Sequence, residues 1–444
     1  PVVRFRGRLH GTTMTDDEHP TTPDAPADEP GEGVPTARDA VPPAPDGGIG
    51  GFYGPPSAPL PPPGLPPVVD GSVPSGPIGL MAPVRAEPKR RSRVRWVVWG
   101  VVGVLVLAGV ISSQINLDYY AIQPGTAQSV QPFITVPPGK AHPVVKPVLL
   151  ADVREARVTA LTYLIFKLQS NTSLYPVPDV TGGTAPSELD AQGNLQMSQA
   201  ESSAKTAALR HLGYSVTATP VGAVIAGTFE GTPAYGVLNV GDVVTALNGT
   251  PTPTALALTR ALAPHHSGQT VTFTVRKGGT AAAGPVSLTL KPTTVQIGGR
   301  TATLDVGILP QDQVAYTYPF PISIDVTDIG GPSAGLAMTL GVIDTLSGGQ
   351  LTGGRTVAAT GTMDPDGQVG DVGGVAQKTV AVEGAGASIF LVPPGEYADA
   401  KSKQQPGLKI YPVSTLDQAL RVLAINGGHV PSNALVAATS TAAG

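Results

Sequence analysis

The fold and the chemistry of this chain are decided by residues 328–343, which run DIGGPSAGLAMTLGVI. After Ser333 the apolar residues at positions 336, 337, 340 and 343 follow helical spacing. We predict a helix whose first turn holds Pro332, where a missing N–H does no harm, with Ser333 at its N-terminus. Free N–H groups and the positive end of the helix dipole would suit a developing oxyanion there. We name Gly331 and Ala334 as supporting residues of this site.

A serine hydroxyl needs a base before it can act as a nucleophile. Histidine is the usual partner, but residues 301–428 contain none. Lysine can serve when burial lowers its pKa by several units from about 10.4. The candidate is Lys378 in GGVAQKTV (residues 373–380), because two glycines followed by an apolar helix would carry this lysine inward. Taken alone, Ser333 has a structural turn as its alternative, and Lys378 a solvated surface position.

Together the two motifs resemble the proteolytic domain of Lon proteases. That family has a P-S-A-G serine followed by a G-G-[apolar]-x-x-K lysine, and here Lys378 follows Ser333 by 378 − 333 = 45 residues. Residues 359–362 and 367–369 match the strand pair of the family. The resemblance implies that Ser333 attacks the scissile carbonyl and that Lys378 takes and returns the proton. Thr360 is either a hydrogen-bond partner of the lysine amine or an ordinary strand residue.

The chain departs from that family at two points. Many Lon domains carry Asp three positions before the serine, where this chain has Gly330, so an acid-assisted step has no support here. The nearest acids are Asp325 and Asp328, and we interpret Asp328 as a turn or capping residue. Lon proper also carries an ATPase, whereas this sequence has no G-x-x-x-x-G-K-[ST] loop to cradle phosphates. We therefore expect no nucleotide and no cofactor.

Composition excludes several other classes of protein. The 444 residues include 28 basic and 32 acidic ones, a formal net charge of −4, which argues against nucleic-acid binding. The absence of Cys excludes a thiol nucleophile, a disulfide framework and a Cys-based zinc site. The sparse His residues lie outside any obvious catalytic motif, and we expect no metal site. Gly (55) and Pro (47) are plentiful, so part of the chain should lack a packed core.

An apolar segment divides the chain. Residues 1–88 form a Pro-rich tail that we predict to be disordered, and residues 89–95 are a basic cluster. Residues 96–115 (WVVWGVVGVLVLAGVISSQI) are long enough to cross a bilayer. The basic flank should stay cytoplasmic, which predicts a single-pass cell-membrane protein with its catalytic part outside. A cleaved signal peptide is the alternative, and the start of translation, at Met14 or upstream, stays open.

Two further segments lie between the apolar segment and the protease. Residues 116–212 are expected to link them and to pack with the protease, with a strand over 157–168 and a helix over 188–212. Residues 213–293 carry G-T-P-A, V-G-D-V-V and L-N-G between alternating strands, and so resemble a bacterial PDZ domain. Such a module adds a peptide strand at a sheet edge and captures a terminal carboxylate with backbone amides. We assign that capture to the loop Gly213-Tyr214-Ser215-Val216, with a blocked or internally used groove as the alternative.

The sequence as a whole predicts an α+β protein: a single N-terminal transmembrane helix, the PDZ-like β-rich domain, a Lon-type α/β proteolytic domain over 300–425 and a flexible tail over 426–444. This order resembles membrane-anchored Lon-like PDZ proteases. The resemblance implies an ATP-independent serine endopeptidase with a Ser-Lys dyad, acting on extracytoplasmic or membrane-tethered proteins that the PDZ domain selects, and association into homo-oligomeric rings. The alternative from another class is a catalytically silent, membrane-anchored PDZ peptide-binding adaptor. The substrate, the cleavage preference and the effect of the PDZ domain on activity stay open.

Overall fold

The computed structural model describes residues 93–181, 188–278, 282–297, 300–326 and 329–431. The chain divides into residues 1–92 and 93–444, and the described residues all belong to the second unit. Several predictions therefore lie outside the described residues, namely those for the Pro-rich tail, most of the basic cluster, Met14, Asp328 and the last part of the C-terminal tail.

The first described element is helix α1 (Arg93–Gln114). Its part from Arg95 to Gln114 has 20 residues with a mean hydropathy of 2.2, none of them buried, and is long and apolar enough to cross a membrane. The apolar helix predicted over 96–115 is thus present, apart from Ile115. The hydroxyls of Ser112 and Ser113 donate to the carbonyls of Ala108 and Val110, which satisfies these polar groups at the end of the helix.

The main sheet is mixed and has the strand order β18-β17-β14-β3-β1-β4. Its strands are β1 (Asn116–Ser129), β3 (Leu149–Thr159), β4 (Ser173–Pro176), β14 (Val357–Ala359), β17 (Ile389–Val392) and β18 (Lys409–Pro412). The pairs β3/β14, β14/β17 and β17/β18 are parallel, while β1 is antiparallel to both β3 and β4. The segment before the PDZ-like region therefore supplies strands to the same sheet as the segment after it.

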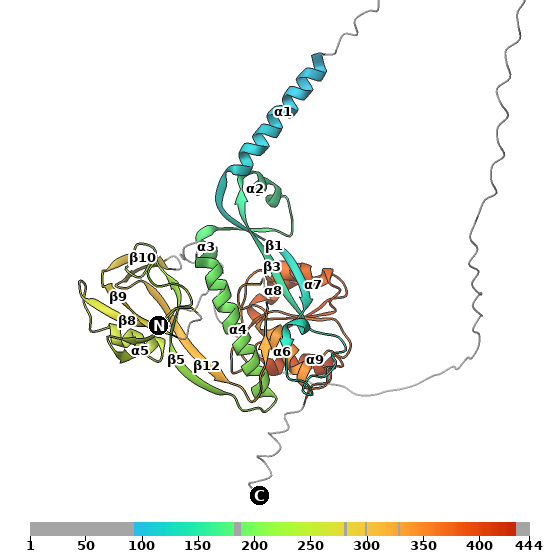
Figure 1. The fold of residues 1–444 in the computed structure, drawn as a ribbon. Coiled ribbons are helices and arrows are strands. Elements are labelled where there is room, and N and C mark those ends of the chain that lie inside the picture. Colours follow the sequence, from blue (N-terminus) through green and yellow to red (C-terminus); the bar gives the residue numbers. More distant parts are fainter. Residues whose placement is uncertain (1–92, 182–187, 279–281, 298–299, 327–328, 432–444) are drawn as a thin grey trace, which may run out of the picture. The chain divides into compact units, whose positions relative to one another are not determined.

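Helices accompany this sheet (Figure 1): α4 (Leu189–His211), α6 (Gly335–Leu346), α7 (Val375–Gly384), α8 (Tyr397–Ser402) and α9 (Leu416–Ile425). α7 packs on β1 and β3, whereas α4 packs along α6. Eleven of the twelve residues of α6 are buried, from Gly335 to Thr345. This burial explains why α6 is apolar on all sides. The prediction of a helix over 188–212 is confirmed to within one residue at each end.

The strand predicted over 157–168 is wrong after its first residues. β3 ends at Thr159, and helix α2 (Ala160–Lys167) follows at once. The Thr159 side chain accepts from the amide of Thr162 at 3.3 Å, and the Thr162 hydroxyl accepts from the amide of Thr159 at 2.7 Å. This reciprocal capping box starts a helix in a segment whose β-branched and aromatic composition favours a strand.

A second, antiparallel sheet has the strand order β12-β5-β6-β8-β9, with β7 beside β6. Its strands are β5 (Thr217–Thr228), β6 (Val243–Leu247), β7 (Thr250–Pro251), β8 (Thr270–Arg276), β9 (Ala283–Thr289) and β12 (Ile308–Thr317). Asn248 and Gly249 both have positive φ, 49° and 81°, between β6 and β7, which confirms the predicted tight turn. Helix α5 (Ala255–Leu262) starts at its N-cap Thr254, close to the predicted boundary. This sheet has its own hydrophobic core, around Leu258 and Phe273.

Short elements complete the described chain: η1 (Gln131–Phe133), β2 (Ile134–Thr135), α3 (Val177–Thr181), β10 (Thr293–Ile297), β11 (Arg300–Leu304), β13 (Ser323–Ile324), β15 (Thr362–Met363), β16 (Val369–Gly370) and η3 (Pro394–Glu396). β15 and β16 pair antiparallel, as predicted for the strand pair near Thr360. β13 pairs antiparallel with β2.

Candidate active site

Ser333 lies in a turn directly before helix α6. The helix begins at Gly335 with Ala334 as its N-cap, and the amide of Gly335 donates to the carbonyl of Pro332 at 3.2 Å. The prediction that Pro332 occupies the first helical turn is therefore wrong by three residues. The first helical residue, Gly335, is packed tightly, since a Cβ at that position would lie 2.6 Å from the amide nitrogen of Met363. The helix can approach β15 so closely only because its first residue is glycine.

The backbone of Ser333 is fixed by the segment that follows β14. Its carbonyl oxygen accepts from the amide of Gly361 at 3.0 Å and from the hydroxyl of Thr360 at 3.2 Å. In return, the amide of Leu336 donates to the carbonyl of Gly361 at 3.1 Å. Gly361 has a φ of +141°, a region that favours glycine. The start of α6 and the end of β14 are thus joined by three hydrogen bonds around the serine.

Lys378 lies on α7 and is 2% exposed. The helix starts at Gly374, which has a left-handed φ of +68°, and a Cβ there would lie 2.8 Å from the Val153 side chain. Lys378 Nζ donates to the hydroxyl of Thr360 at 3.2 Å. The Thr360 hydroxyl therefore links the lysine amine to the carbonyl of Ser333. Among the described residues, the structure records no direct hydrogen bond between the Ser333 hydroxyl and the lysine amine.

Burial sets the protonation behaviour of the lysine. It lowers the pKa of Lys378 to about 8, although the carboxylates of Glu396, Asp152 and Glu155 act to raise that pKa. A neutral amine is thus accessible near neutral pH. Burial also raises the pKa of Glu396 to about 7, with Asp371 acting in the same direction and Lys378 opposing it. Sequence reasoning missed Glu396, because its proximity to Lys378 follows from the packing of the fold and not from a motif.

Helix α4 holds the loop that precedes Ser333. The amide of Gly331 donates to the carbonyl oxygen of Gly193 at 3.1 Å. The neighbouring Gln192 donates its side-chain amide to the carbonyl of Ala226 in β5 at 3.1 Å. The Gly331 amide, predicted as a supporting donor, is therefore engaged in this structure. In the part of the chain that the structure describes, no partner is recorded for the amide of Ala334.

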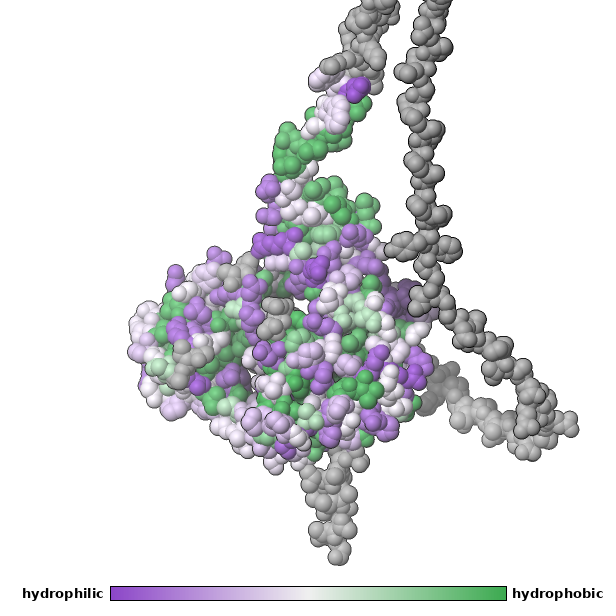
Figure 2. All heavy atoms as spheres, turned by 45° about the vertical axis from the view of Figure 1, so that its right-hand side comes forward, coloured by the Kyte–Doolittle hydropathy of each residue, from purple (hydrophilic) through white to green (hydrophobic). Residues whose placement is uncertain are grey.

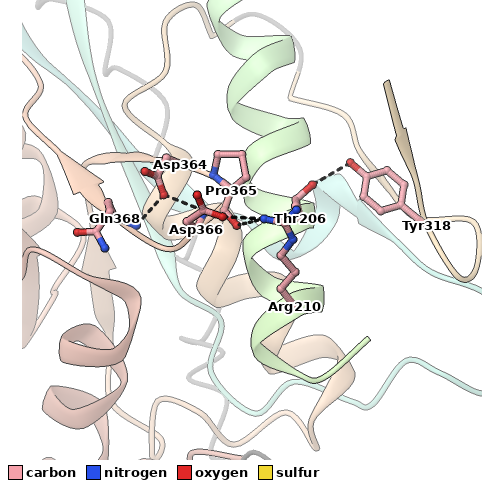
Figure 3. Close-up of polar contacts among 7 residues, drawn as sticks. All are labelled: Thr206, Arg210, Tyr318, Asp364, Pro365, Asp366 and Gln368. Carbon is pink, nitrogen blue, oxygen red and sulfur yellow. Dashed lines mark hydrogen bonds and ion pairs between the residues drawn. The ribbon is translucent and has the colours of Figure 1, made fainter. Parts of the chain in front are cut away.

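The C-terminal end of α4 is fixed to the turn between β15 and β16 (Figure 3). Arg210 forms an ion pair with Asp366 at 2.8 Å and also donates to the carbonyl of Pro365 at 3.2 Å. Asp364 closes the turn by accepting from the amide of Gln368 at 2.8 Å. α4 thus contacts the serine loop near its start and the β15–β16 turn near its end.

A pocket of about 340 Å³ lies at this second contact, but its lining contains neither Ser333 nor Lys378. It is lined by Ala207, Arg210, His211, Pro365, Asp366, Gly367, Gln368, Thr415, Leu416 and Asp417. We assign it no part in the candidate chemistry.

The loop assigned to peptide capture lies elsewhere than expected. Gly213 has a φ of +82° and ends α4, where its amide donates to the carbonyl of Arg210 and the amide of Tyr214 donates to the carbonyl of Leu209. Tyr214 and Val216 pack against the core that contains α4 and α6, and not against the core of the second sheet. With two of its four amides engaged in ending a helix, Gly213–Val216 is not retained as a peptide site.

An edge strand of the second sheet was missed by sequence reasoning. β12 is the edge strand next to β5 and lies beyond the range assigned to the PDZ-like region. Helix α5 contacts β12, and the amide of Ala255 donates to the Asp312 carboxylate at 2.7 Å. The alternating residues of β12 were a usable signal, but its pairing with β5 spans about 90 residues of sequence and could not be predicted from local pattern.

Ser333, Thr360 and Lys378 all lie in a segment that matches a known domain family. Residues 325–426 match the Lon protease (S16) C-terminal proteolytic domain. This Lon-type segment contains α6, α7 and the strands between them, so the two motif residues and their threonine link belong to it.

Curated Lon proteases are similar to part of the chain. The Lon protease of Chloroflexus aggregans is 31% identical over 137 residues, which cover 30% of this chain and 16% of that protein. Lon protease 2 of Bacillus subtilis is 32% identical over 127 residues, which cover 28% of this chain and 22% of that protein. The matched part is thus less than a quarter of the length of these relatives.

PDZ-like structures are found among the solved structures that the chain resembles. The PDZ domain of an SdrC-like protein from Listeria innocua shares 24% sequence identity and covers 20% of this chain and 92% of that chain, with a TM-score of 0.17.

Proposed function

We propose that this chain is a membrane-anchored, ATP-independent serine endopeptidase in which Ser333 is the nucleophile and Lys378 is the general base. The observation that carries the proposal is the buried Lys378 amine, which donates to Thr360 while Thr360 donates to the carbonyl of Ser333. The similarity of residues 325–426 to the Lon proteolytic domain supports a serine protease. The nucleophilic role of Ser333 and the general-base role of Lys378 are part of this proposal.

In the proposed reaction, the Ser333 hydroxyl attacks the carbonyl carbon of the scissile peptide bond, and its proton passes to the neutral amine of Lys378. The tetrahedral intermediate collapses when the C–N bond breaks, and the leaving amine takes that proton from the Lys378 ammonium. Water then attacks the acyl-enzyme ester while Lys378 takes its proton, and the ester C–O bond breaks as the Lys378 ammonium returns that proton to the Ser333 oxygen, which releases the new carboxyl product and restores Ser333. The Thr360 hydroxyl can accept a hydrogen bond from the lysine in its neutral and in its protonated form.

The developing oxyanion needs backbone donors near the serine. The amide of Ala334 is the first candidate, because it follows the nucleophile and has no recorded partner among the described residues. The amide of Gly331 becomes available only if its hydrogen bond to Gly193 breaks. We therefore propose Ala334 as the first oxyanion donor and Gly331 as a conditional one.

Substrate choice is proposed to rest on the second sheet and on the anchor. An extended peptide that adds to the free edge of β12, beside α5, would gain backbone hydrogen bonds from a sheet with PDZ-like topology. With α1 crossing the bilayer, the Lon-type segment lies on the side opposite the basic cluster, so membrane-tethered substrates gain effective concentration. We propose extracytoplasmic or membrane-tethered proteins with flexible segments as the substrate class, and a homo-oligomeric ring as the assembly.

The test is cleavage of an unstructured casein-type protein by the full chain in detergent, with and without ATP and Mg²⁺. Wild type is compared with Ser333→Ala and Lys378→Ala, and with the exposed control substitutions Ser287→Ala and Lys409→Ala. We expect cleavage without ATP by wild type and both controls, and its loss in both dyad variants. Cleavage that survives in Ser333→Ala removes the serine from its proposed role, and no cleavage by any form favours the silent adaptor.

A further inference from the structure

Helix α2 is apolar but has no buried residue. Among its eight residues, ALTYLIFK, only Thr162 and Lys167 are polar. Leu164 is 64% exposed, Ile165 46% and the following Leu168 88%. These three residues are the α2 patch, in which Leu164 and Leu168 are four positions apart and so lie on one side of the helix, with Ile165 next to Leu164. An apolar helix is expected to bury one face against another element, so the α2 patch requires a cover that the described chain does not provide.

The position of α2 is fixed by the end of the candidate membrane span. The amide of Ala160, the first residue of α2, donates to the carbonyl of Ile115 at 2.9 Å, and Asn116 pairs with Thr159. α1 contacts both α2 and β3. Figure 1 shows α2 beside the C-terminal end of α1, and Figure 2 shows hydrophobic surface at α2 close to that end. If α1 crosses the bilayer, α2 has to lie at the bilayer surface.

Aromatic and cationic side chains surround the α2 patch. Tyr119 and Tyr163 have ring centroids 5.5 Å apart, and Lys167 Nζ lies 5.7 Å from the Tyr163 centroid. The Arg157 guanidinium lies 5.7 Å from the Tyr120 ring and donates to its hydroxyl at 3.3 Å. Tyrosines with an apolar body and a polar tip gather at the headgroup level of membranes, and Lys and Arg extend their charges to anionic headgroups there.

We propose that α2 lies in the bilayer interface on the side where α1 ends, with the α2 patch inserted at the boundary between headgroups and acyl chains. The inference rests on the membrane anchor of the proposed function and adds a second, monotopic contact to it. Lipid is the occupant that the structure favours over a second copy of the chain, because α2 contacts the candidate membrane span α1, and because Lys167 on α2 and Arg157 just before it are cations of the kind that anionic lipids attract. The contact would hold the main sheet at the membrane surface, since β1 and β3 lead directly out of this region.

The test uses the absence of Cys from the chain, which makes any introduced Cys unique. Full-length Leu164→Cys is labelled with an environment-sensitive fluorophore and reconstituted into vesicles of phosphatidylcholine and phosphatidylglycerol, with or without lipids brominated on the acyl chains. Leu105→Cys on α1 reports the anchor itself. Leu256→Cys is the matched control, because Leu256 is 57% exposed but lies on α5.

We expect the emission of the label at positions 105 and 164 to shift to shorter wavelength and to be quenched by the brominated lipids, and the label at 256 to do neither. Quenching at 105 with a label at 164 that behaves like the label at 256 overturns the inference and leaves the anchor intact. Absence of quenching at 105 contradicts the membrane anchor, and the inference is then wrong as well because it rests on that anchor. The inference is also overturned if the label at 164 is shifted but not quenched by the brominated lipids and lies close to the label at 164 of another chain. A second copy of the chain then covers the α2 patch.

Discussion

The hydroxyl of Thr360 lies 3.2 Å from the Lys378 amine and accepts its hydrogen bond inside the protein, where Thr360 itself is fully buried. A buried amine in a low-dielectric site depends strongly on such a partner. This contact favours the first of the two interpretations that the sequence leaves open for Thr360.

Thr360→Val keeps the shape of the side chain and removes the hydroxyl. Leaving a buried polar group without its partner costs about 1 to 3 kcal/mol, so we expect kcat to fall about 10- to 100-fold. KM should change little, and Thr360→Ser should restore most of the rate. Steady-state kinetics on a flexible peptide separates these effects, and full activity in Thr360→Val would return Thr360 to the status of an ordinary strand residue.

The pH dependence of activity should follow the lysine. Lys378 acts only when neutral, and burial lowers its pKa to about 8. We therefore expect kcat/KM to rise about tenfold per pH unit below pH 8 and to level off above it. A profile measured from about pH 6 to 10 checks this expectation, and a flat profile across neutrality would exclude Lys378 as the titrating base.

Glu396→Gln should move that profile to lower pH. The Glu396 carboxylate acts to raise the pKa of Lys378, so its removal lets the amine lose its proton more easily. The half-maximal pH of kcat/KM should fall below that of wild type. Glu230→Gln, at an exposed position in the second sheet region, is the control and should leave the profile in place. A shift toward higher pH in Glu396→Gln would contradict the electrostatic account.

Gly335→Ala should disturb the turn that carries the serine. The added Cβ would lie 2.6 Å from the Met363 amide nitrogen, so α6 has to move away from β15. We expect a loss of about 1 to 3 kcal/mol in the free energy of unfolding and a clear loss of activity. Gly373→Ala is the matched control, because nothing lies within 4 Å of its Cβ. Thermal unfolding of both variants beside wild type measures this loss. Equal stability of the two variants would show that the close approach of α6 to β15 is unimportant.

Local sequence patterns predicted the helices and strands around the site better than the contacts between them. The motifs placed Ser333 at the start of an apolar helix and Lys378 on another, and the structure buries Lys378 as expected. The first turn of α6 was placed three residues too early, since the contact between Gly335 and Met363 joins segments that no local pattern connects. Hydrophobic periodicity describes one element at a time, whereas contacts between elements depend on the whole fold.

The same limit explains the other differences. The start of α2 is fixed by a pair of threonines whose hydrogen bonds outweigh the strand propensity of the residues after them. The segment Gly213–Val216 was assigned to the second sheet because it precedes β5, but Tyr214 packs against Phe320 at a centroid distance of 5.3 Å instead. Glu396 carries no motif, and its effect on Lys378 arises only when β17 and α7 pack together.

Two adjacent residues of α4 face two different parts of the protein: Gln192 holds strand β5, and Gly193 holds the amide of Gly331. The helix therefore contacts both the second sheet and the loop that precedes the serine. A peptide that binds at the edge of β12 would lie one strand away from β5, which α4 contacts, and α4 also holds the loop that precedes Ser333. Peptide binding at the second sheet and the conformation of the serine loop would then be coupled through α4.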